Sequence, residues 1–173
     1  MDQITDVLEF FSMGIKLLSN YYSGDPETRR RFADELGRRL EEAADEDNRL
    51  LRLDLADCAD FAELLRAVCA ALGEEAGQPE TPLSGLQKAV GALDRRLFRE
   101  EKCVCLLIEN FDLCERRWAE ADFGWFRNLL YSSDVFSCVT VSDRHIDLFA
   151  HAPSMGSALS NIFTVAEETG GAA

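Results

Sequence analysis

The sequence is poor in histidine and in positive charge, and each shortage excludes a class of protein. Its 173 residues include two histidines and no C-x-x-C pair, so the usual spacings of zinc ligands do not occur. The 18 Lys and Arg residues are outnumbered by 32 Asp and Glu, which gives a formal charge of −14. That field opposes a nucleic-acid duplex and an anionic membrane surface. The sequence therefore predicts that neither nucleic acid nor a membrane is a partner.

Long apolar runs are also absent. Runs such as CVCLLI at 103–108 are far too short to cross a bilayer, and the N-terminal MDQITD carries acid where a secretory signal has Lys or Arg. With no mark of export, the six cysteines are expected to be reduced and mostly buried. We expect a soluble, cytoplasmic protein with one domain at residues 1–168 and a flexible tail at 169–173.

Short apolar strands alternate with amphipathic helices along the chain. Strand patterns cover 15–22, 49–55, 102–109, 135–142 and 161–166. The third of these is apolar almost throughout, as is typical of a central strand in a parallel sheet that is covered on both faces. Because helices of ordinary length separate the strands, right-handed crossovers are expected. The prediction is an α/β three-layer sandwich with a parallel sheet of about five strands.

Four segments carry a resemblance to a known family. They are SGDPETRRRFADEL (23–36), LLRLDLADCADFAELLRAV (50–68), CVCLLIENFDLC (103–114), and VFSCVTVSDRHIDLF (135–149) followed by SALSNIFTVAE (157–167). In order, they are similar to the Walker A region, the second strand and helix, the Walker B strand, and the sensor-1 and last strands of P-loop NTPases. The chain resembles the bacterial AAA+ and STAND-type ATPases of that superfamily. The resemblance implies the sheet order 5-1-4-3-2.

The segment that resembles Walker A departs from the pattern G-x-x-x-x-G-K-[ST]. Gly24 keeps the first glycine. The second glycine, the lysine and the Ser/Thr fall on Arg29, Arg30 and Arg31. A side chain at the second glycine crowds the phosphates, and arginine has no hydroxyl for Mg²⁺. We expect the loop to be filled by its own side chains, with the arginines paired to carboxylates such as Asp34 or Glu35. The alternative is that GDPE is a turn that begins a helix.

The Walker B and sensor positions are altered or weak. The resemblance puts Glu109 at the Mg²⁺-binding Asp and Asn110 at the catalytic Glu, and an amide cannot act as a general base. The alternative is a buried strand that ends in a polar turn. Ser142 falls at the polar sensor. We expect no helical lid of the kind that the family has after its last strand. We expect no catalytic residue, no metal site and no cofactor.

The resulting functional hypothesis is a catalytically degenerate ATPase-like domain that serves as a protein-interaction or regulatory subunit. The partner would be a protein, such as an intact ATPase or an effector, and a homo-oligomer stays open. Aromatic side chains at 118–131 are the candidate interaction surface, unless they pack on the sheet and a neighbouring helix. They are Trp118, Phe123, Trp125 and Phe126.

Two other functions stay open. One is a nucleotide-binding switch or slow ATPase that binds ATP and Mg²⁺ weakly and uses Arg30 and Glu109 in unusual roles. The other is an unrelated doubly wound α/β enzyme.

Overall fold

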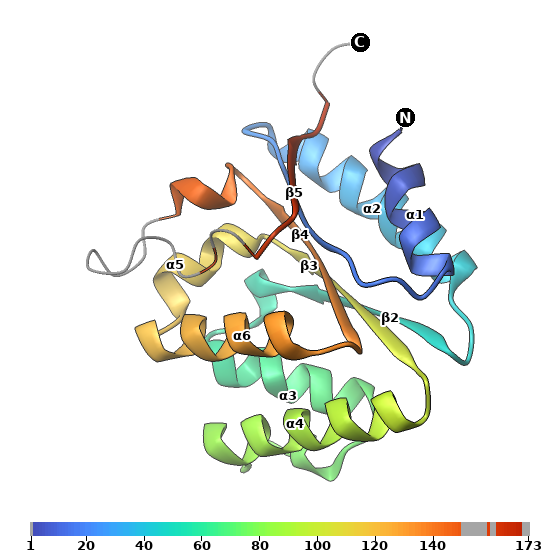
Figure 1. Cartoon of the computed structure of the whole chain (residues 1–173). Coiled ribbons are helices and arrows are strands. Elements are labelled where there is room, and N and C mark those ends of the chain that lie inside the picture. Colours follow the sequence, from blue (N-terminus) through green and yellow to red (C-terminus); the bar gives the residue numbers. More distant parts are fainter. Residues whose placement is uncertain (1, 150–158, 160–161, 171–173) are drawn as a thin grey trace.

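Five parallel strands form one sheet in the computed structural model, which describes residues 2–149, 159 and 162–170 (Figure 1). The strands are β1 (Leu18–Tyr22), β2 (Asn48–Asp54), β3 (Cys103–Glu109), β4 (Phe136–Ser142) and β5 (Val165–Glu168). Their order is β2-β3-β4-β1-β5. This is the predicted order 5-1-4-3-2 read from the other edge, so the predicted fold class and strand order are confirmed.

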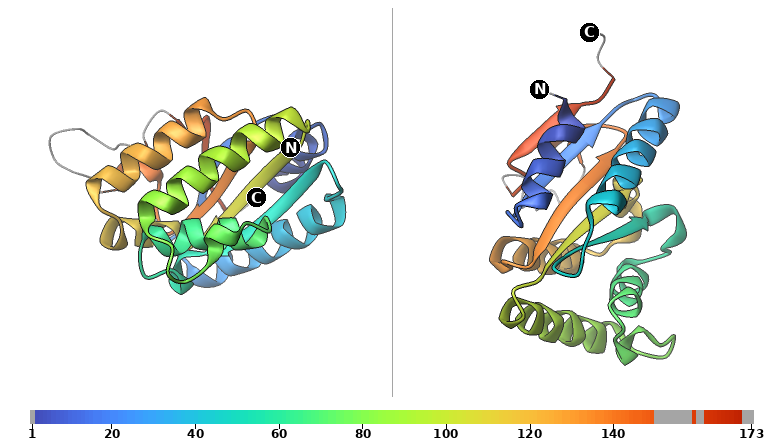
Figure 2. Two further views of the ribbon diagram at one scale, coloured as in Figure 1. Left: turned by 90° about the horizontal axis from the view of Figure 1, so that it is seen from below. Right: turned by 90° about the vertical axis from the view of Figure 1, so that its right-hand side faces the viewer.

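Helices cover both faces of the sheet (Figures 1 and 2). The helices are α1 (Gln3–Ser12), α2 (Pro26–Ala43), α3 (Phe61–Ala71), α4 (Leu83–Arg99), α5 (Cys114–Arg117) and α6 (Glu120–Ser132). Short 3-10 turns are η1 (Leu55–Asp57), η2 (Glu75–Gly77), η3 (Phe111–Leu113) and η4 (Ile146–Leu148). One apolar core lies between the sheet and α1 with α2, and the other lies between the sheet and α3, α4 and α6.

The apolar run of β3 explains why this strand is central. Cys105 and Leu107 belong to the core under α1 and α2, whereas Val104, Leu106 and Ile108 belong to the opposite core. Since successive side chains of a strand point to opposite faces, a strand covered on both faces needs apolar residues at every position. Each such aliphatic side chain contributes about 1.5–3 kcal/mol when fully buried.

The predicted strand at 15–22 begins later than expected, at Leu18. Gly14 adopts φ +63°, and the N–H of Ile15 donates to the carbonyl of Phe10 at 3.0 Å. These contacts end α1 with a left-handed turn, so Ile15 and Lys16 belong to the connection. The strand was predicted to begin at residue 15 because Ile15 is apolar.

The predicted helix at 118–131 is also different, because Trp118 has extended backbone between α5 and α6. The carboxylate of Asp122 accepts the N–H of Ala119 at 2.7 Å and caps α6. At the C-terminus the strand predicted at 161–166 is found at Val165–Glu168, with residue 161 outside the described residues. Thr169, assigned to the flexible tail, is buried and donates its N–H to the Tyr22 carbonyl at 2.7 Å, and 171–173 lie outside the described residues.

Across residues 2–149, 159 and 162–170, none of the helices combines the length and apolar composition that a bilayer crossing demands. All six cysteines lie in the described part of the chain as free thiols, and all except the half-buried Cys103 are buried. The expectation of mostly buried thiols is confirmed.

Candidate functional site

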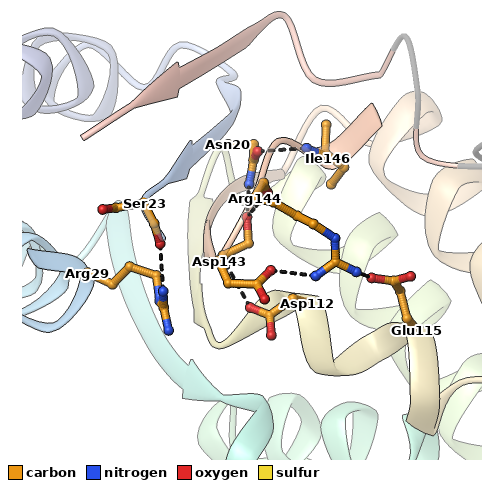
Figure 3. Close-up of polar contacts among 9 residues, drawn as sticks. Asn20, Ser23, Arg29, Asp112, Glu115, Asp143, Arg144 and Ile146 are labelled. Carbon is orange, nitrogen blue, oxygen red and sulfur yellow. Dashed lines mark hydrogen bonds and ion pairs between the residues drawn. The ribbon is translucent and has the colours of Figure 1, made fainter. Parts of the chain in front are cut away.

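The carboxyl ends of β1, β3 and β4 meet at one edge of the sheet, where parallel α/β sheets place their ligand sites. The residues that follow these strands are Ser23 after β1, Asn110 after β3 and Asp143 after β4. Figure 3 shows this edge with its polar contacts. The positions that the sequence singled out as nucleotide-binding and catalytic are all near it.

The connection from β1 to α2 is three residues long, Ser23 to Asp25. Pro26 is the first residue of α2, a position that proline favours because its missing N–H has no helical partner there. The helix therefore begins before the phosphate-binding loop of the family pattern would end. Arg29, Arg30 and Arg31 lie inside α2 and not in a loop, and this corrects the placement expected from the sequence.

The N-terminus of α2 is occupied by the carboxylate of Asp25. One carboxylate oxygen accepts the N–H of Thr28 at 2.9 Å and the Thr28 hydroxyl at 2.5 Å. These hydrogen bonds lower the pKa of Asp25. A helix N-terminus attracts one anion through its free N–H groups and its dipole. Here the chain supplies that anion itself.

The arginines of α2 contact the chain close by. Arg29 donates to the Ser23 carbonyl at 2.6 Å, which fastens the helix to the end of β1 (Figure 3). Arg30 pairs with Glu27 at 2.7 Å, one turn earlier on the exposed face of the helix. Arg31 is exposed. We expected the side chains of residues 23–31 to occupy the place of a phosphate in this segment, and the contacts of Asp25 and Arg29 confirm this for those two residues.

The expected partners of these arginines were wrong. Asp34 pairs with Arg52 of β2 at 2.6 Å, and Glu35 pairs with Arg38 at 2.8 Å. Spacing on the helix allows Glu35 to reach either Arg31 or Arg38, and Arg38 is held by two carboxylates, those of Glu35 and Glu42. Asp34 instead faces the sheet edge, where β2 brings an arginine from 18 residues away.

The Walker B position is held by an ion pair. Glu109 at the end of β3 accepts from Nε of Arg52 at 2.5 Å, and the same guanidinium reaches Asp34 (Asp34 Oδ1–Arg52 Nη2) at 2.6 Å. The hydrogen bond that Arg52 donates to Glu109 raises the pKa of Arg52. Gly37 of α2 leaves room for the guanidinium, because a Cβ there would lie 3.0 Å from Nη1 of Arg52. The carboxylate at the Mg²⁺ position therefore already faces a cation.

Asn110, at the position of the catalytic Glu, ties β3 to β2. Its backbone is left-handed with φ 51°, a conformation that Asn tolerates better than most residues. Its amide donates to Asp54 Oδ1 at 2.8 Å, and the same oxygen accepts the N–H of Ala56 at 2.8 Å. The side chain serves as a structural hydrogen-bond donor in this arrangement.

Ser142, at the sensor position, is fully buried in a network that joins β1 and β4. Asn20 donates to Ser142 Oγ and to Thr140 Oγ1, both at 2.9 Å. Asn20 in turn accepts the N–H of Ile146 at 3.2 Å, and Ser142 donates to the Arg144 carbonyl at 2.8 Å (Figure 3). The Ser142 hydroxyl points into this network. The sequence analysis did not predict a role for Asn20, although a polar residue within an apolar strand could have indicated one.

An acidic pair lies beside this network. The N–H of Asp143 donates to Asp112 Oδ1 at 3.0 Å, and the Asp143 carboxylate pairs with Arg144 at 2.6 Å. Arg144 also contacts Glu115 (Figure 3). Burial and the neighbouring Asp112 raise the pKa of Asp143. The arrangement links β4 to the segment that follows β3.

A pocket of about 450 Å³ lies between the N-terminus of α2 and the ends of β2 and β3. Its lining residues are Pro26, Arg29, Arg30, Ala33, Asp34, Arg52, Asp54, Glu109, Asn110 and Val141. In the described part of the chain, no three His, Cys, Asp or Glu side chains gather in a way that would hold a metal ion. The pocket is large enough for a small ligand. Of its charged groups, Asp34, Arg52 and Glu109 are engaged with one another, whereas Arg29 and Arg30 contact Ser23 and Glu27 outside the lining.

The aromatic residues proposed as an interaction surface belong mainly to the core. Trp118, Phe123 and Phe126 are buried, and Trp118 and Phe126 both contact Phe61. Trp125 is partly buried and meets Phe61 edge-on at 5.8 Å between ring centroids. The interaction prediction is therefore wrong for the three buried residues. Their number reflects an aromatic cluster between α3, α6 and the sheet.

Solved structures with the same architecture come from ORC and Cdc6 proteins. The ORC2 protein of Aeropyrum pernix, solved as ADPNP–ADP complexes, has a TM-score of 0.67 and 12% identity over 96% of this chain and 46% of that chain. Cdc6p from Pyrobaculum aerophilum has a TM-score of 0.63 and 13% identity over 95% of this chain and 43% of that chain. This chain has an α/β fold like that of the P-loop AAA+ ATPases. A chain of Drosophila ORC bound to GC-rich DNA and Cdc6 has a TM-score of 0.60 and 14% identity, over 96% and 57%.

The likeness between this chain and these AAA+ proteins concerns the fold alone, because so few residues are identical. This chain spans about half the length of the solved structures that it matches. No protein-family model matches the sequence, and no curated protein matches it. One similar structure is the ORC1 protein of Aeropyrum pernix in complex with DNA, so the AAA+ fold gives no support to the prediction that nucleic acid is not a partner. The bacterial, STAND-type assignment stays a prediction.

Proposed function

We propose that this chain is a catalytically degenerate AAA+ domain that takes part in protein interaction or regulation and does not turn over ATP. The observation that carries the proposal is the Asp25 carboxylate, which accepts the N–H of Thr28 at the start of α2. A nucleotide phosphate needs those N–H groups for itself. A fixed carboxylate there also repels an incoming anion.

The metal position supports the same conclusion. Mg²⁺ is held by oxygen ligands at short distance and in near-octahedral geometry. Glu109 and Asp34 both direct an oxygen to the guanidinium of Arg52. A cation near Glu109 would meet the positive charge of Arg52 and would have to displace it. Because Arg52 already holds both carboxylates, the residues do not fit a Mg²⁺–nucleotide complex.

The hydrolytic step has no general base at the expected place. Asn110 occupies the position of the catalytic Glu, and its amide is engaged with Asp54. Phosphoryl transfer depends on positioning and charge stabilisation more than on covalent chemistry by the protein. Loss of the phosphate cradle, the metal ligand and the base therefore removes most of what an ATPase supplies.

A second candidate function is a nucleotide-binding switch, and the pocket of about 450 Å³ favours it. Arg29, Arg30 and Arg52 line this pocket and offer donors to phosphate oxygens. Binding in this way requires Arg52 to leave Glu109. The fold gives no support to the remaining alternative, an unrelated doubly wound enzyme.

A protein is the proposed partner. The formal charge of −14 opposes association with a phosphate backbone. A domain without turnover can still provide surfaces for an intact ATPase or an effector.

The test is calorimetric titration with ATP and ADP in the presence of Mg²⁺, together with a phosphate-release assay. We expect no saturable heat at micromolar to millimolar nucleotide and no phosphate release above background. Arg52→Gln frees Glu109 from its ion pair, and Arg38→Gln is the matched control, because Arg38 pairs only with exposed glutamates of α2. Neither variant is expected to gain binding.

Two results would contradict the proposal. Micromolar binding by the unmodified chain would favour the nucleotide-binding switch. Binding or hydrolysis that appears in Arg52→Gln and not in Arg38→Gln would mean that an intact metal site is only masked by Arg52.

A further inference from the structure

Large apolar side chains are exposed in the connections at the edge of the sheet opposite the candidate site. They are Met13 (61% exposed), Ile15 (46%), Phe98 (59%) and Tyr131 (77%), here called the amino-edge patch. Each lies at the end of a helix, or just after it, in the segments that lead into β1, β3 and β4. Because all five strands are parallel, these segments reach the same edge, at the lower right of the sheet in Figure 1.

Hydrogen bonds hold these connections side by side. Lys16 Nζ donates to the carbonyls of Tyr131 at 3.3 Å and Ser133 at 2.5 Å. Ser133 Oγ donates to the carboxylate of Asp94 at 2.5 Å. Phe98 lies one helical turn after Asp94 in α4. The patch is thus formed by three connections that are fixed to one another.

The connection after α1 also lies across the starts of β2 and β3. The thiol of Cys103 donates to the Gly14 carbonyl at 3.6 Å, and a Cβ on Gly14 would lie 3.4 Å from Asn48 Oδ1. Single exposed apolar residues are common, but a fixed group of them at one edge is typical of a contact surface.

Acidic residues lie in or beside the connections at this end of the sheet. They are Asp45, Glu46, Asp47, Asp94, Glu100, Glu101 and Asp134. Of the basic residues nearby, Lys16 is engaged with two carbonyls, and Lys102 and Arg96 each lie 3.9 Å from Glu100. Arg39 lies beside Met13 and pairs with Asp2 at 3.6 Å, while Arg99 is exposed. The apolar patch therefore has a predominantly negative rim, and such a rim selects a partner of opposite charge.

We propose that the amino-edge patch docks a basic segment of another protein, in which apolar side chains are flanked by Lys or Arg. The proposal rests on the proposed role in protein interaction and names the surface for it. A second copy of this chain is a poor occupant, because it brings another acidic rim and a formal charge of −14. Like charges brought together at an interface oppose association.

The probe is a 14-residue amphipathic peptide of Leu and Lys, compared with the same peptide in which Glu replaces Lys. Binding is measured by fluorescence anisotropy at low and at physiological salt, and the site is mapped by amide chemical-shift changes. We expect the Leu–Lys peptide to bind at least about tenfold more tightly than the Leu–Glu peptide, with salt weakening it. Shifts should fall on 13–16, 98–101 and 131–134.

The variant for this test is Ile15→Ser combined with Tyr131→Ser, which removes two exposed apolar side chains of the patch. The matched control is Leu148→Ser, since Leu148 is 68% exposed but lies at the opposite, carboxyl edge. The double variant should lose about tenfold or more in affinity for the Leu–Lys peptide, and Leu148→Ser should bind like the unmodified chain. Circular dichroism checks that all variants keep the fold.

Three outcomes of the peptide experiments would overturn the proposal. They are equal affinity of the double variant and the unmodified chain, shifts centred on the carboxyl edge, and equal binding of the two peptides. A concentration-dependent dimer in sedimentation that the double variant abolishes would instead assign the patch to a second copy, which also contradicts it. Failure here leaves the nucleotide titrations unaffected, so the two proposals can fail separately.

Discussion

Tyr21 shows how strongly the sheet shields a single side chain. It is buried in β1, and its ring lies 5.0 Å from that of Phe32 between centroids. Burial raises the pKa of the Tyr21 hydroxyl to about 12, and the nearby carboxylates of Glu167 and Asp6 act in the same direction. The folded state therefore holds this proton more tightly than the unfolded state does.

The sign of the resulting pH dependence follows from linkage. Because the folded pKa lies above the unfolded value of 10, the contribution of Tyr21 to stability is complete below pH 10 and is lost as the pH rises through 12. Between pH 9 and pH 11, the free energy of unfolding should therefore fall less in Tyr21→Phe than in the unmodified chain. The difference should be about 1 kcal/mol after screening is allowed for. Urea unfolding at the two pH values measures this.

The control for this prediction is Tyr131→Phe, because Tyr131 is 77% exposed. Its urea midpoints should change with pH as those of the unmodified chain do. Parallel pH dependence in Tyr21→Phe and the unmodified chain would contradict the prediction.

At the scale of elements, Gly37 couples α2 to the ion pair at the end of β3. A glycine inside a helix costs about 1 kcal/mol relative to alanine. A Cβ at residue 37, however, would lie 3.0 Å from Nη1 and 3.3 Å from Cδ of Arg52. Space for the guanidinium thus offsets a loss of helix propensity.

This coupling predicts a non-additive mutant cycle. Gly37→Ala should raise the free energy of unfolding by clearly less than about 1 kcal/mol, because it displaces Arg52 from Glu109 and Asp34. In an Arg52→Ala background the same substitution should give the full gain, as measured by urea unfolding of the four proteins. Additive effects would mean that Arg52 adjusts without cost.

The elements show which parts of the site a sequence can predict. The resemblance assigned Glu109 and Asn110 to the Walker B positions and Ser142 to the sensor position, and the structure places each at or next to the end of an apolar strand. Arg52 was missed because its partners come from β3 and α2, and a pattern within one strand does not reveal a contact between strands. Its signal was an arginine inside the apolar run RLLRLDL.

The three arginines of α2 were misplaced for a local reason. Asp25 followed by Pro26 is a strong signal for the start of a helix, and this signal decides the local structure over the family spacing. The alternative reading of GDPE as a turn that begins a helix was therefore the accurate one. The sheet order, by contrast, came from the resemblance, since apolar periodicity contains no information on which strands are neighbours.

At the scale of the whole molecule, the single sheet joins two separate cores. One core contains Leu36 and Leu40 of α2, and the other contains both tryptophans, Trp118 within it and Trp125 packed against it. The strands β3 and β4 contribute side chains to both cores. Neither layer of helices keeps its packing surface if the sheet is lost, so the described layers should unfold together.

Leu40→Ala tests this coupling across the sheet. Leu40 is fully buried on the face away from the tryptophans, and a buried Leu→Ala change costs about 2–5 kcal/mol. In a two-state transition, tryptophan fluorescence and far-ultraviolet circular dichroism report the same midpoint. We expect both midpoints to fall together in Leu40→Ala, although the fluorescent groups lie on the opposite face. A variant in which the dichroism midpoint falls and the fluorescence midpoint stays would show that the α1–α2 layer unfolds independently of the rest.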